Sequence, residues 1–426
     1  MIILSHEHAK QRIASNGHVF KEQEIAFHNE EGADVLCLKV AQNKDVHGEN
    51  TCSLTTGYYV GVDWIDEQHA VVVAPKINED AAHTDYITLL TSCMHVFSND
   101  IKHTDLFEIK FDSPYVQIEK HQDLLSPLLI AYFLQLVKAI VKKGIRKSYY
   151  KVENNLRSRI KGKILIPKTL KKNVFKGEAL KNYCAYDEFG PNNTENQILK
   201  KTLLIIRRFI SGFPLFNQQL GSSLNLCLSA FEQVDSDVDV KGIASFKHNP
   251  LFKEYGQALE LSKLILARFG YNEAIITGRK TDKVAVPPYW INMPMLFELY
   301  VLAKLKQQYG NAVNFQALGS FGWRPDFLLA TEQQKIIIDA KYKPRYQAES
   351  KGSADDIRQI SGYARDSKIL KQLDLNEDEQ QRKPVDCLII YIDQSASEAL
   401  PDDLLQTKIN GLVNFYKLPI RLPTID

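Results

Sequence analysis

Two aspartates and a lysine in the last third of the chain have the types and spacing of a metal-binding group. Asp326 and Asp339 lie in two consecutive strand candidates, which are joined by the four polar residues 331–334. In a hairpin closed by that loop, Asp326 faces Asp339 at about 5 Å, where like charges are destabilising. Lys341 lies on the same face as Asp339, because strand side chains repeat every two residues. The pattern therefore predicts two carboxylates and one ammonium group held together.

The residues before Asp339 indicate what could offset the repulsion. Asp339 follows Ile336, Ile337 and Ile338, an apolar run typical of a strand that is buried on both faces. A carboxylate emerging there is partly desolvated unless it is paired or binds a metal ion. Two oxygen donors with no Cys or His nearby in the sequence favour Mg²⁺ over Zn²⁺. The alternative is that both aspartates project into solvent and that Lys341 forms a surface ion pair with one of them.

Three further polar residues lie where they could join this group. Glu298 has the apolar residues Met295 and Leu302 at helical spacing, which puts it on the packing face of a helix. Gln359 and Tyr363 are four residues apart and so share one face of a second helix. The alternatives are a glutamate at the edge of the apolar stripe and a polar pair on a solvated helix.

The elements that must position these residues form an α/β pattern in the last third of the chain. The acidic stretch 374–379 is expected to be a solvated loop. We predict helices over residues 295–309 and 354–373, and strands over 324–330, 335–340 and 385–392.

The rest of the chain has a different character. Residues 1–125 alternate short apolar runs with polar turns, which is typical of a β-rich module. Helical spacing then predicts helices over 124–145, 195–210 and 251–269. The fold class is therefore a multidomain α/β and α+β protein. Its expected parts are an N-terminal β-rich module at 1–125, a helical and basic middle region at 126–284, and a C-terminal α/β domain at 285–426.

Composition excludes several classes of protein. The chain has 426 residues, of which 44 % are hydrophobic and 24 % are charged, so disorder, collagen and coiled coil do not describe it as a whole. Uninterrupted apolar stretches stay short of the roughly 20 residues that a membrane helix needs. The first residues do not resemble a secretory signal, so a cytoplasmic location is expected. The six cysteines are far apart and lack zinc spacing, which indicates reduced thiols.

Positive charge is concentrated in one window of the chain. Residues 138–181 contain 15 Lys and Arg residues against two acidic residues, Glu153 and Glu178, whereas the whole chain carries only +2. Such asymmetry is the electrostatic pattern of a polyanion-binding surface. The alternatives are an acidic patch on a protein partner and a solvated basic face without a ligand. The candidate DNA-binding residues are Lys142, Lys143, Arg146, Lys147, Arg157, Arg159, Lys161 and Lys163.

Taken together, the charged residues match a known nuclease pattern. The match is strongest where Pro325 precedes the first aspartate and an apolar strand precedes the second. The chain resembles PD-(D/E)xK nucleases, and RecB-like members of that group, in the motifs Arg324-Pro325-Asp326, Ile338-Asp339-Ala340-Lys341 and Gln359-Ile360-Ser361-Gly362-Tyr363.

The resemblance narrows to the McrC family, which supplies the nuclease subunit of modified-cytosine-dependent restriction systems. It extends from about residue 153 to 391 and is looser over residues 1–125. The segments that carry it are 183–188, 195–200, 295–301 and 339–343.

The resemblance implies a restriction-endonuclease-like fold for 285–426 and Mg²⁺-dependent hydrolysis of phosphodiester bonds, with Mn²⁺ as a substitute. Asp326, Asp339, Glu298 and the carbonyl group of Ala340 are the implied metal ligands. Lys341 is implied to orient the attacking water and to neutralise charge on the phosphate. Gln359 and Tyr363 are implied to support the site or to touch DNA.

The resemblance also implies partners. McrC subunits work with McrB, a hexameric AAA+ GTPase that recognises modified DNA, and they stimulate its GTP hydrolysis. This chain has no evident nucleotide site, since residues 278–281 only approximate a phosphate-binding loop. We therefore expect a prokaryotic, cytoplasmic subunit that binds duplex DNA and an McrB-like ring, with residues 1–125 docking on the ring.

Two other functions remain open on the sequence alone. One is a self-sufficient RecB-like repair nuclease, which would cut without a partner or a nucleotide. The other is a non-catalytic adaptor that binds DNA and an AAA+ ring. Trp290 and Trp323 flank the helix expected over 295–309 and the strand expected over 324–330, and core packing is favoured over base stacking for both.

Overall fold

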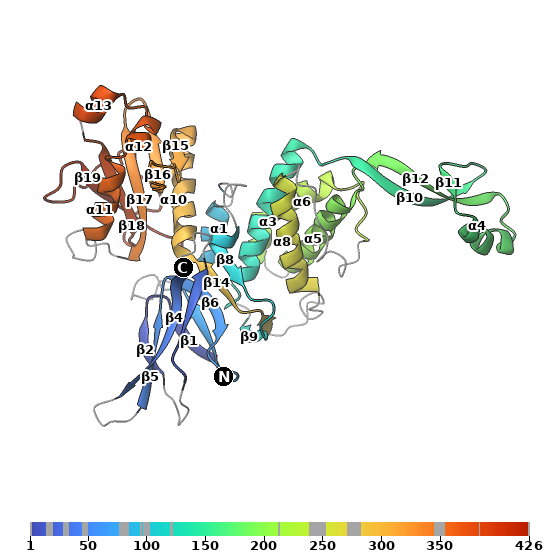
Figure 1. The fold of residues 1–426 in the computed structure, drawn as a ribbon, viewed down its shortest axis with the longest axis horizontal. Coiled ribbons are helices and arrows are strands. Elements are labelled where there is room, and N and C mark those ends of the chain that lie inside the picture. The colour runs from blue at the N-terminus through green and yellow to red at the C-terminus, as the bar shows by residue number, and fades with distance from the viewer. Residues whose placement is uncertain are drawn as a thin grey trace. The chain divides into compact units, whose positions relative to one another are not determined.

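The structure, a computed structural model, separates into two compact units (Figure 1). The first combines Met1–Leu128 with Thr281–Asp426, and the second is Leu129–Lys280. The described residues are 2–13, 20–28, 34–44, 50–75, 85–93, 96, 103–119, 122–211, 214–237, 253–270, 283–344, 354–382 and 384–424. The near-miss phosphate loop at 278–281 lies outside these ranges.

The N-terminal part of the first unit is rich in strands, as the alternation of apolar runs and polar turns predicts. One sheet of four strands has the order β2-β5-β4-β3, and one of five strands has the order β1-β7-β6-β14-β8. The strands are β1 (Ile2–His6), β2 (Lys10–Ile13), β3 (Gln23–His28), β4 (Asp34–Lys44), β5 (Asn50–Thr56), β6 (Tyr59–Trp64), β7 (Ala70–Ala74) and β8 (Phe107–Ile109). Two short helices, α1 (Tyr86–Cys93) and α2 (His103–Leu106), accompany them.

Two strands that follow the middle of the chain return to this β-rich part. β13 (Lys283–Val286) pairs with β9 (Val116–Glu119), and β14 (Tyr289–Asn292) inserts between β6 and β8. Trp290 on β14 is fully buried and donates from its indole nitrogen to Asp63 Oδ2 at 3.0 Å, which confirms the expected core role of this tryptophan. The β-rich part is therefore completed by two strands that come just before the C-terminal part in the chain.

The C-terminal part of the first unit is a five-stranded sheet in the order β15-β16-β17-β18-β19. Its first three strands are antiparallel and its last three are parallel. β17 and β18 carry continuous runs of buried aliphatic residues, which is typical of strands that are covered on both faces. The elements are α10 (Met293–Tyr309), η4 (Gly310–Ala312), β15 (Val313–Phe315), β16 (Phe327–Ala330), β17 (Lys335–Pro344), α11 (Ala354–Tyr363), α12 (Ser367–Gln372), α13 (Glu377–Arg382), β18 (Asp386–Ile392) and β19 (Phe415–Ile420).

Two predictions about this part need correction. The helix expected over 354–373 is two helices, because Asp366 caps α12 through the backbone N–H groups of Lys368 and Ile369. The loop expected at 374–379 contains the first residues of α13, which begins at Glu377. In contrast, the predicted hairpin register is confirmed, since Ala330 pairs with Lys335 in the ladder of β16 and β17.

The second unit contains the expected helices and also a sheet that its composition did not suggest. The helices are α3 (Leu125–Lys143), α4 (Ile166–Lys172), η3 (Val174–Lys176), α5 (Thr194–Ile210), α6 (Pro214–Ala230) and α8 (Lys253–Gly270). β10 (Ser148–Arg157) and β12 (Lys181–Gly190) pair over their full length, and the short β11 (Lys163–Ile164) joins β12. The middle region is thus helical only in part.

The strands of the second unit form a long projection, which we call the arm (Ser148–Gly190). It extends from the helices of this unit and carries α4 at its far end (Figure 1). Most of its side chains are exposed, and Leu156, Thr169, Asn173 and Cys184 are among the few buried ones. The arm is therefore held by its backbone ladder and by its base rather than by a large apolar core.

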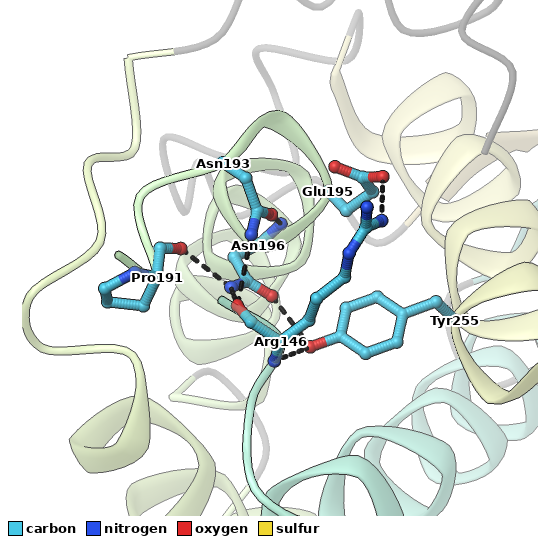
Figure 2. A network of polar contacts seen from close by, with 6 residues as sticks. All are labelled: Arg146, Pro191, Asn193, Glu195, Asn196 and Tyr255. Carbon is cyan, nitrogen blue, oxygen red and sulfur yellow. Dashed lines mark hydrogen bonds and ion pairs between the residues drawn. The ribbon is translucent and has the colours of Figure 1, made fainter. Parts of the chain in front are cut away.

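A polar network fixes the base of the arm (Figure 2). The Arg146 guanidinium lies 2.5 Å from Glu195 Oε1, and both side chains are largely buried. The carbonyl oxygen of Arg146 accepts from the side-chain amides of Asn193 and Asn196 at 3.1 and 2.8 Å. The Tyr255 hydroxyl accepts from the backbone N–H of Arg146 and donates to Asn196. This base network joins the end of α3 to the starts of α5 and α8.

Among the described residues, one helix has the length and apolar composition to cross a membrane. It is α3, and 67 % of its apolar window is buried inside the structure. A mostly buried helix of this kind is typical of a protein core.

All six cysteines are free and buried, as their spacing predicts.

Candidate active site

The hairpin of β16 and β17 brings the two aspartates to neighbouring positions. Asp326 directly precedes β16, and the ladder register, in which Phe327 pairs with Ile338, places it opposite Asp339. Asp326 Oδ2 accepts a hydrogen bond from the backbone N–H of Ala340 at 2.6 Å. The predicted pair is therefore held by the strand backbone itself.

Lys341 lies beside Asp339 on β17, as the strand alternation predicts. Its Nζ atom is 2.8 Å from Asp339 Oδ2, and the Asp339 side chain is only 1 % exposed. Lys341 also donates to Gln359 Oε1 at 3.1 Å, and Gln359 donates to the Tyr363 hydroxyl at 2.8 Å. Lys341, Gln359 and Tyr363 are thus brought together by β17 and α11.

Glu298 is a half-buried residue of α10, the helix that packs against β17. Its Oε2 atom accepts from the side-chain amide of Gln316 at 3.4 Å. Gln316 has a positive φ of 48°, and its backbone N–H donates to the carbonyl oxygen of Asp326. The structure therefore links Glu298 to the start of β16 through a residue that the sequence did not single out.

The three carboxylates, Glu298, Asp326 and Asp339, oppose one another's ionisation, and we call them the acidic site. Burial and then the charge of Asp339 raise the pKa of Glu298 to about 7. Burial, followed by the charges of Glu298 and Asp339, raises the pKa of Asp326 well above its usual value. Burial also raises the pKa of Asp339, although Lys341 partly offsets this. Without a cation besides Lys341, the three groups therefore do not all ionise readily at neutral pH.

The donor set fits a hard divalent cation. All three groups offer oxygen atoms, which Mg²⁺ prefers. Asp339 Oδ2 is buried and, apart from the Lys341 ion pair, has no hydrogen-bond partner among the described residues. In the described part of the chain, no group of three or more His, Cys, Asp and Glu side chains is already arranged to hold a metal ion. A cation would therefore have to draw these oxygens together.

Asp356 is a charged neighbour that sequence reasoning missed. It lies in the first turn of α11, 2.9 Å from Lys343 Nζ and 3.8 Å from Lys341 Nζ. Burial disfavours the charged form of Lys341, but Asp339, Asp326 and Asp356 outweigh it and raise the pKa of the lysine. In the sequence, an acidic first turn resembled an ordinary helix start, so it gave no signal.

The basic residues singled out as DNA-binding candidates all lie in the second unit. Arg146 differs from the others because it is held in the base network by Glu195. Lys161 lies over the Tyr186 ring and 3.4 Å from Glu188, with both side chains about half exposed. The exposed candidates are Lys142, Lys143, Lys147, Arg157, Arg159, Lys161 and Lys163.

Trp323 departs from the expectation of core packing. It is 45 % exposed and lies beside Phe321, which is 79 % exposed. Both belong to the segment between β15 and β16, just before Asp326.

Comparison with known protein families identifies one family. The model of the family described as McrBC 5-methylcytosine restriction system component matches residues 54–373. No curated protein matches the chain. Among solved structures, this chain is 15 % identical to a chain of the refined half-complex from the tetradecameric assembly of Thermococcus gammatolerans McrB AAA+ hexamers with bound McrC. The match covers 99 % of this chain and 94 % of that one, with a TM-score of 0.39. A chain of the cryo-EM structure of the Thermococcus gammatolerans McrBC complex is 16 % identical over 72 % of this chain and 88 % of that one, with a TM-score of 0.31.

Proposed function

The chain belongs to the family of McrBC 5-methylcytosine restriction system components, and from that membership we propose that it is the Mg²⁺-dependent endonuclease subunit of such a system. The observation that carries the proposal is the convergence of Asp326, Asp339 and Lys341 on one hairpin, next to Glu298 on α10. Acidic residues paired with a lysine at the end of a strand are the side chains that a PD-(D/E)xK nuclease requires. We therefore assign the sheet of β15 to β19 to that fold.

Each residue of the site has a chemical part in phosphodiester hydrolysis. Asp326 and Asp339 would hold Mg²⁺, with Glu298 and the carbonyl oxygen of Ala340 as further ligands. When bound, the ion would polarise the scissile phosphate as a Lewis acid. Because its pKa is raised, Lys341 stays protonated at neutral pH, so it acts as a donor and a positive charge rather than as a base.

Two residues on α11 would keep Lys341 in place. Gln359 accepts from the lysine and donates to Tyr363, so the ammonium group is held between Asp339 and the helix. Holding the ammonium group in advance lowers the cost of ordering it as charge develops on the phosphate. Gln359 and Tyr363 are thus positioning residues in this proposal.

The partner of the proposed subunit is an McrB-like AAA+ GTPase hexamer, whose GTP hydrolysis this chain would stimulate. Family membership supports this, and the chain itself shows no phosphate-binding loop motif in its sequence. The substrate would be duplex DNA with modified cytosine, in a prokaryotic cytoplasm. The exposed basic residues of the arm supply the charge that DNA or an acidic partner surface would bind.

Cleavage assays with the neighbouring AAA+ protein test this function. Methylated and unmethylated duplexes are incubated with Mg²⁺ and GTP, using wild type and Asp339→Ala with and without the partner. We expect cutting that needs the partner, GTP and Asp339. Cutting by the lone chain would instead favour a self-sufficient nuclease. An absence of cutting in every mixture would favour a non-catalytic adaptor.

A further inference from the structure

The segment at 317–323, which we call the aromatic loop, exposes three large apolar side chains beside the proposed nuclease site. Phe321 is 79 % exposed, and Leu318 and Trp323 are each 45 % exposed. Single exposed apolar residues are common, but three within six positions, two of them in ring contact, mark a candidate interaction site. The proposed mechanism uses none of them.

The aromatic loop is held in one conformation. Asp366 accepts from both the backbone N–H and the hydroxyl of Ser320, each at 2.7 Å. The backbone N–H of Gly319 donates to the carbonyl oxygen of Trp323. The side-chain amide of Gln372 donates to the carbonyl oxygen of Leu318. A loop tied at three points presents its side chains with little further loss of entropy on binding.

A chain of contacts through Tyr363 and Gln359 joins the aromatic loop to Lys341. The ring centroids of Phe321 and Trp323 are 5.4 Å apart, and those of Trp323 and Tyr363 are 6.4 Å apart. Tyr363 accepts from Gln359, which in turn accepts from Lys341. The exposed rings are thus continuous with the group that would act on the phosphate.

The charges next to the aromatic loop favour nucleic acid over an apolar protein surface or a lipid. The exposed Arg324 follows Trp323 directly, and the exposed Arg365 and Lys368 flank the Asp366 that holds the loop. Asp366 itself is buried and its oxygens accept hydrogen bonds. Aromatic rings with cations beside them are the combination that binds bases and phosphates together.

We infer that the aromatic loop is a nucleobase-binding site, in which Phe321, with Trp323 beside it, stacks on an unstacked base of the strand whose phosphate lies at Lys341. This inference rests on the proposed nuclease function. Stacking requires only a ring face, so the loop takes any base. Its role is to hold the strand next to the scissile phosphate, and the recognition of modified cytosine lies elsewhere.

The test compares two single-stranded probes of equal charge. A 16-nucleotide labelled strand and the same strand with abasic residues are bound to the full-length protein in chelator, and affinity is measured by fluorescence anisotropy. For Phe321→Ala we expect about tenfold weaker binding of the base-bearing strand and little change for the abasic strand. Phe321→Leu keeps apolar area without a ring face, so its affinity for the base-bearing strand should fall between those of wild type and Phe321→Ala. Val413→Ala, which trims another exposed apolar side chain of the same unit, should match wild type.

Several outcomes would overturn the inference. Wild-type affinity of Phe321→Ala, or equal weakening for both probes, would mean that the ring does not contact bases. A variant that binds DNA normally but stimulates the partner's GTPase poorly would assign the aromatic loop to the protein partner. The nuclease proposal has a separate readout, because cleavage by Asp339→Ala would remove that proposal and leave the base-binding result standing.

Discussion

The acidic site and the arm use charge in opposite ways. In the acidic site, Asp339 is 1 % exposed and lies against Lys341, and neighbouring carboxylates raise one another's pKa. In the arm, ion pairs such as Lys161–Glu188 join side chains that are about half exposed. Buried charges interact strongly and suit chemistry at one point, whereas exposed charges are screened and suit attraction of a large polyanion. The two regions should therefore respond differently to mutation, pH and salt.

Apart from the loss of a carboxylate, the largest expected effect is at Lys341, which lies beside the acidic site. Lys341→Ala should lower the cleavage rate about 10²-fold to 10³-fold, because the proposed function loses the ammonium group that would stabilise charge on the phosphate. Single-turnover cleavage with the partner and GTP measures it. Lys343→Ala is the matched control, since Lys343 lies two residues further along β17 and pairs with Asp356 instead. Equal loss in both variants would mean that Lys341 has no special role.

The base of the arm is an exception to the arm's exposed character, and it provides the next largest effect. Glu195→Ala removes the carboxylate that lies 2.5 Å from the largely buried Arg146 guanidinium, so the free energy of unfolding should fall by about 3 kcal/mol. Urea unfolding followed by circular dichroism measures this. Glu153→Ala removes an exposed ion pair with Lys168 and should leave the transition unchanged. A small effect of Glu195→Ala would show that the base network does not anchor the arm.

A smaller effect is expected where a buried carboxylate of the first unit is fully hydrogen-bonded. Asp366→Ala removes the cap of α12 and the tie to Ser320, and should lower the free energy of unfolding by about 2 kcal/mol. Burial opposes ionisation of Asp366, but hydrogen bonds from Ser320, Lys368 and Ile369 outweigh it and lower its pKa.

The lowered pKa sets the pH dependence of this effect. The ionised Asp366 stabilises the fold above pH 4 or so, because the pKa of an aspartate in an unfolded chain is about 4. This contribution is lost as pH falls through the lower pKa that Asp366 has in the folded protein. The stability difference between wild type and Asp366→Asn should therefore shrink below about pH 4. A difference that stays constant to lower pH would assign it to geometry rather than to charge.

The smallest effect is expected from single cations of the arm. Arg159→Ala should weaken DNA binding a few-fold and lower the slope of log affinity against log salt by about 0.9, the value for one phosphate contact. Anisotropy titrations at several salt concentrations provide both numbers. Lys408→Ala, an exposed lysine of the first unit, is the control. An unchanged slope for Arg159→Ala would favour the partner surface as the ligand of the arm.

The hairpin at the acidic site could be predicted because its determinants are local. A four-residue loop fixes the register, and alternation then places Asp339 and Lys341 on one face. Helical spacing likewise predicted that Glu298 faces the packing side of a helix, and the structure has it half-buried on α10. The grouping of these residues followed from patterns that span only a few residues each.

Features that depend on distant contacts could not be predicted. β14 completes a sheet with strands more than 180 residues earlier, and no local pattern records that pairing. The sequences of β10 and β12 lack a clear alternation of apolar and polar residues, because few residues of the arm are buried. Trp323 was expected in a core because its apolar ring is typical of one, and nothing nearby in sequence indicates its exposure.

The most direct test of the acidic site uses a variant of unchanged shape. Asp339→Asn keeps the size of the side chain but removes its charge, and its DNA affinity and single-turnover cleavage are measured with Mg²⁺, the partner and GTP. The account predicts near wild-type DNA binding and a loss of cleavage of at least 10³-fold. Cleavage by Asp339→Asn at the wild-type rate would contradict it.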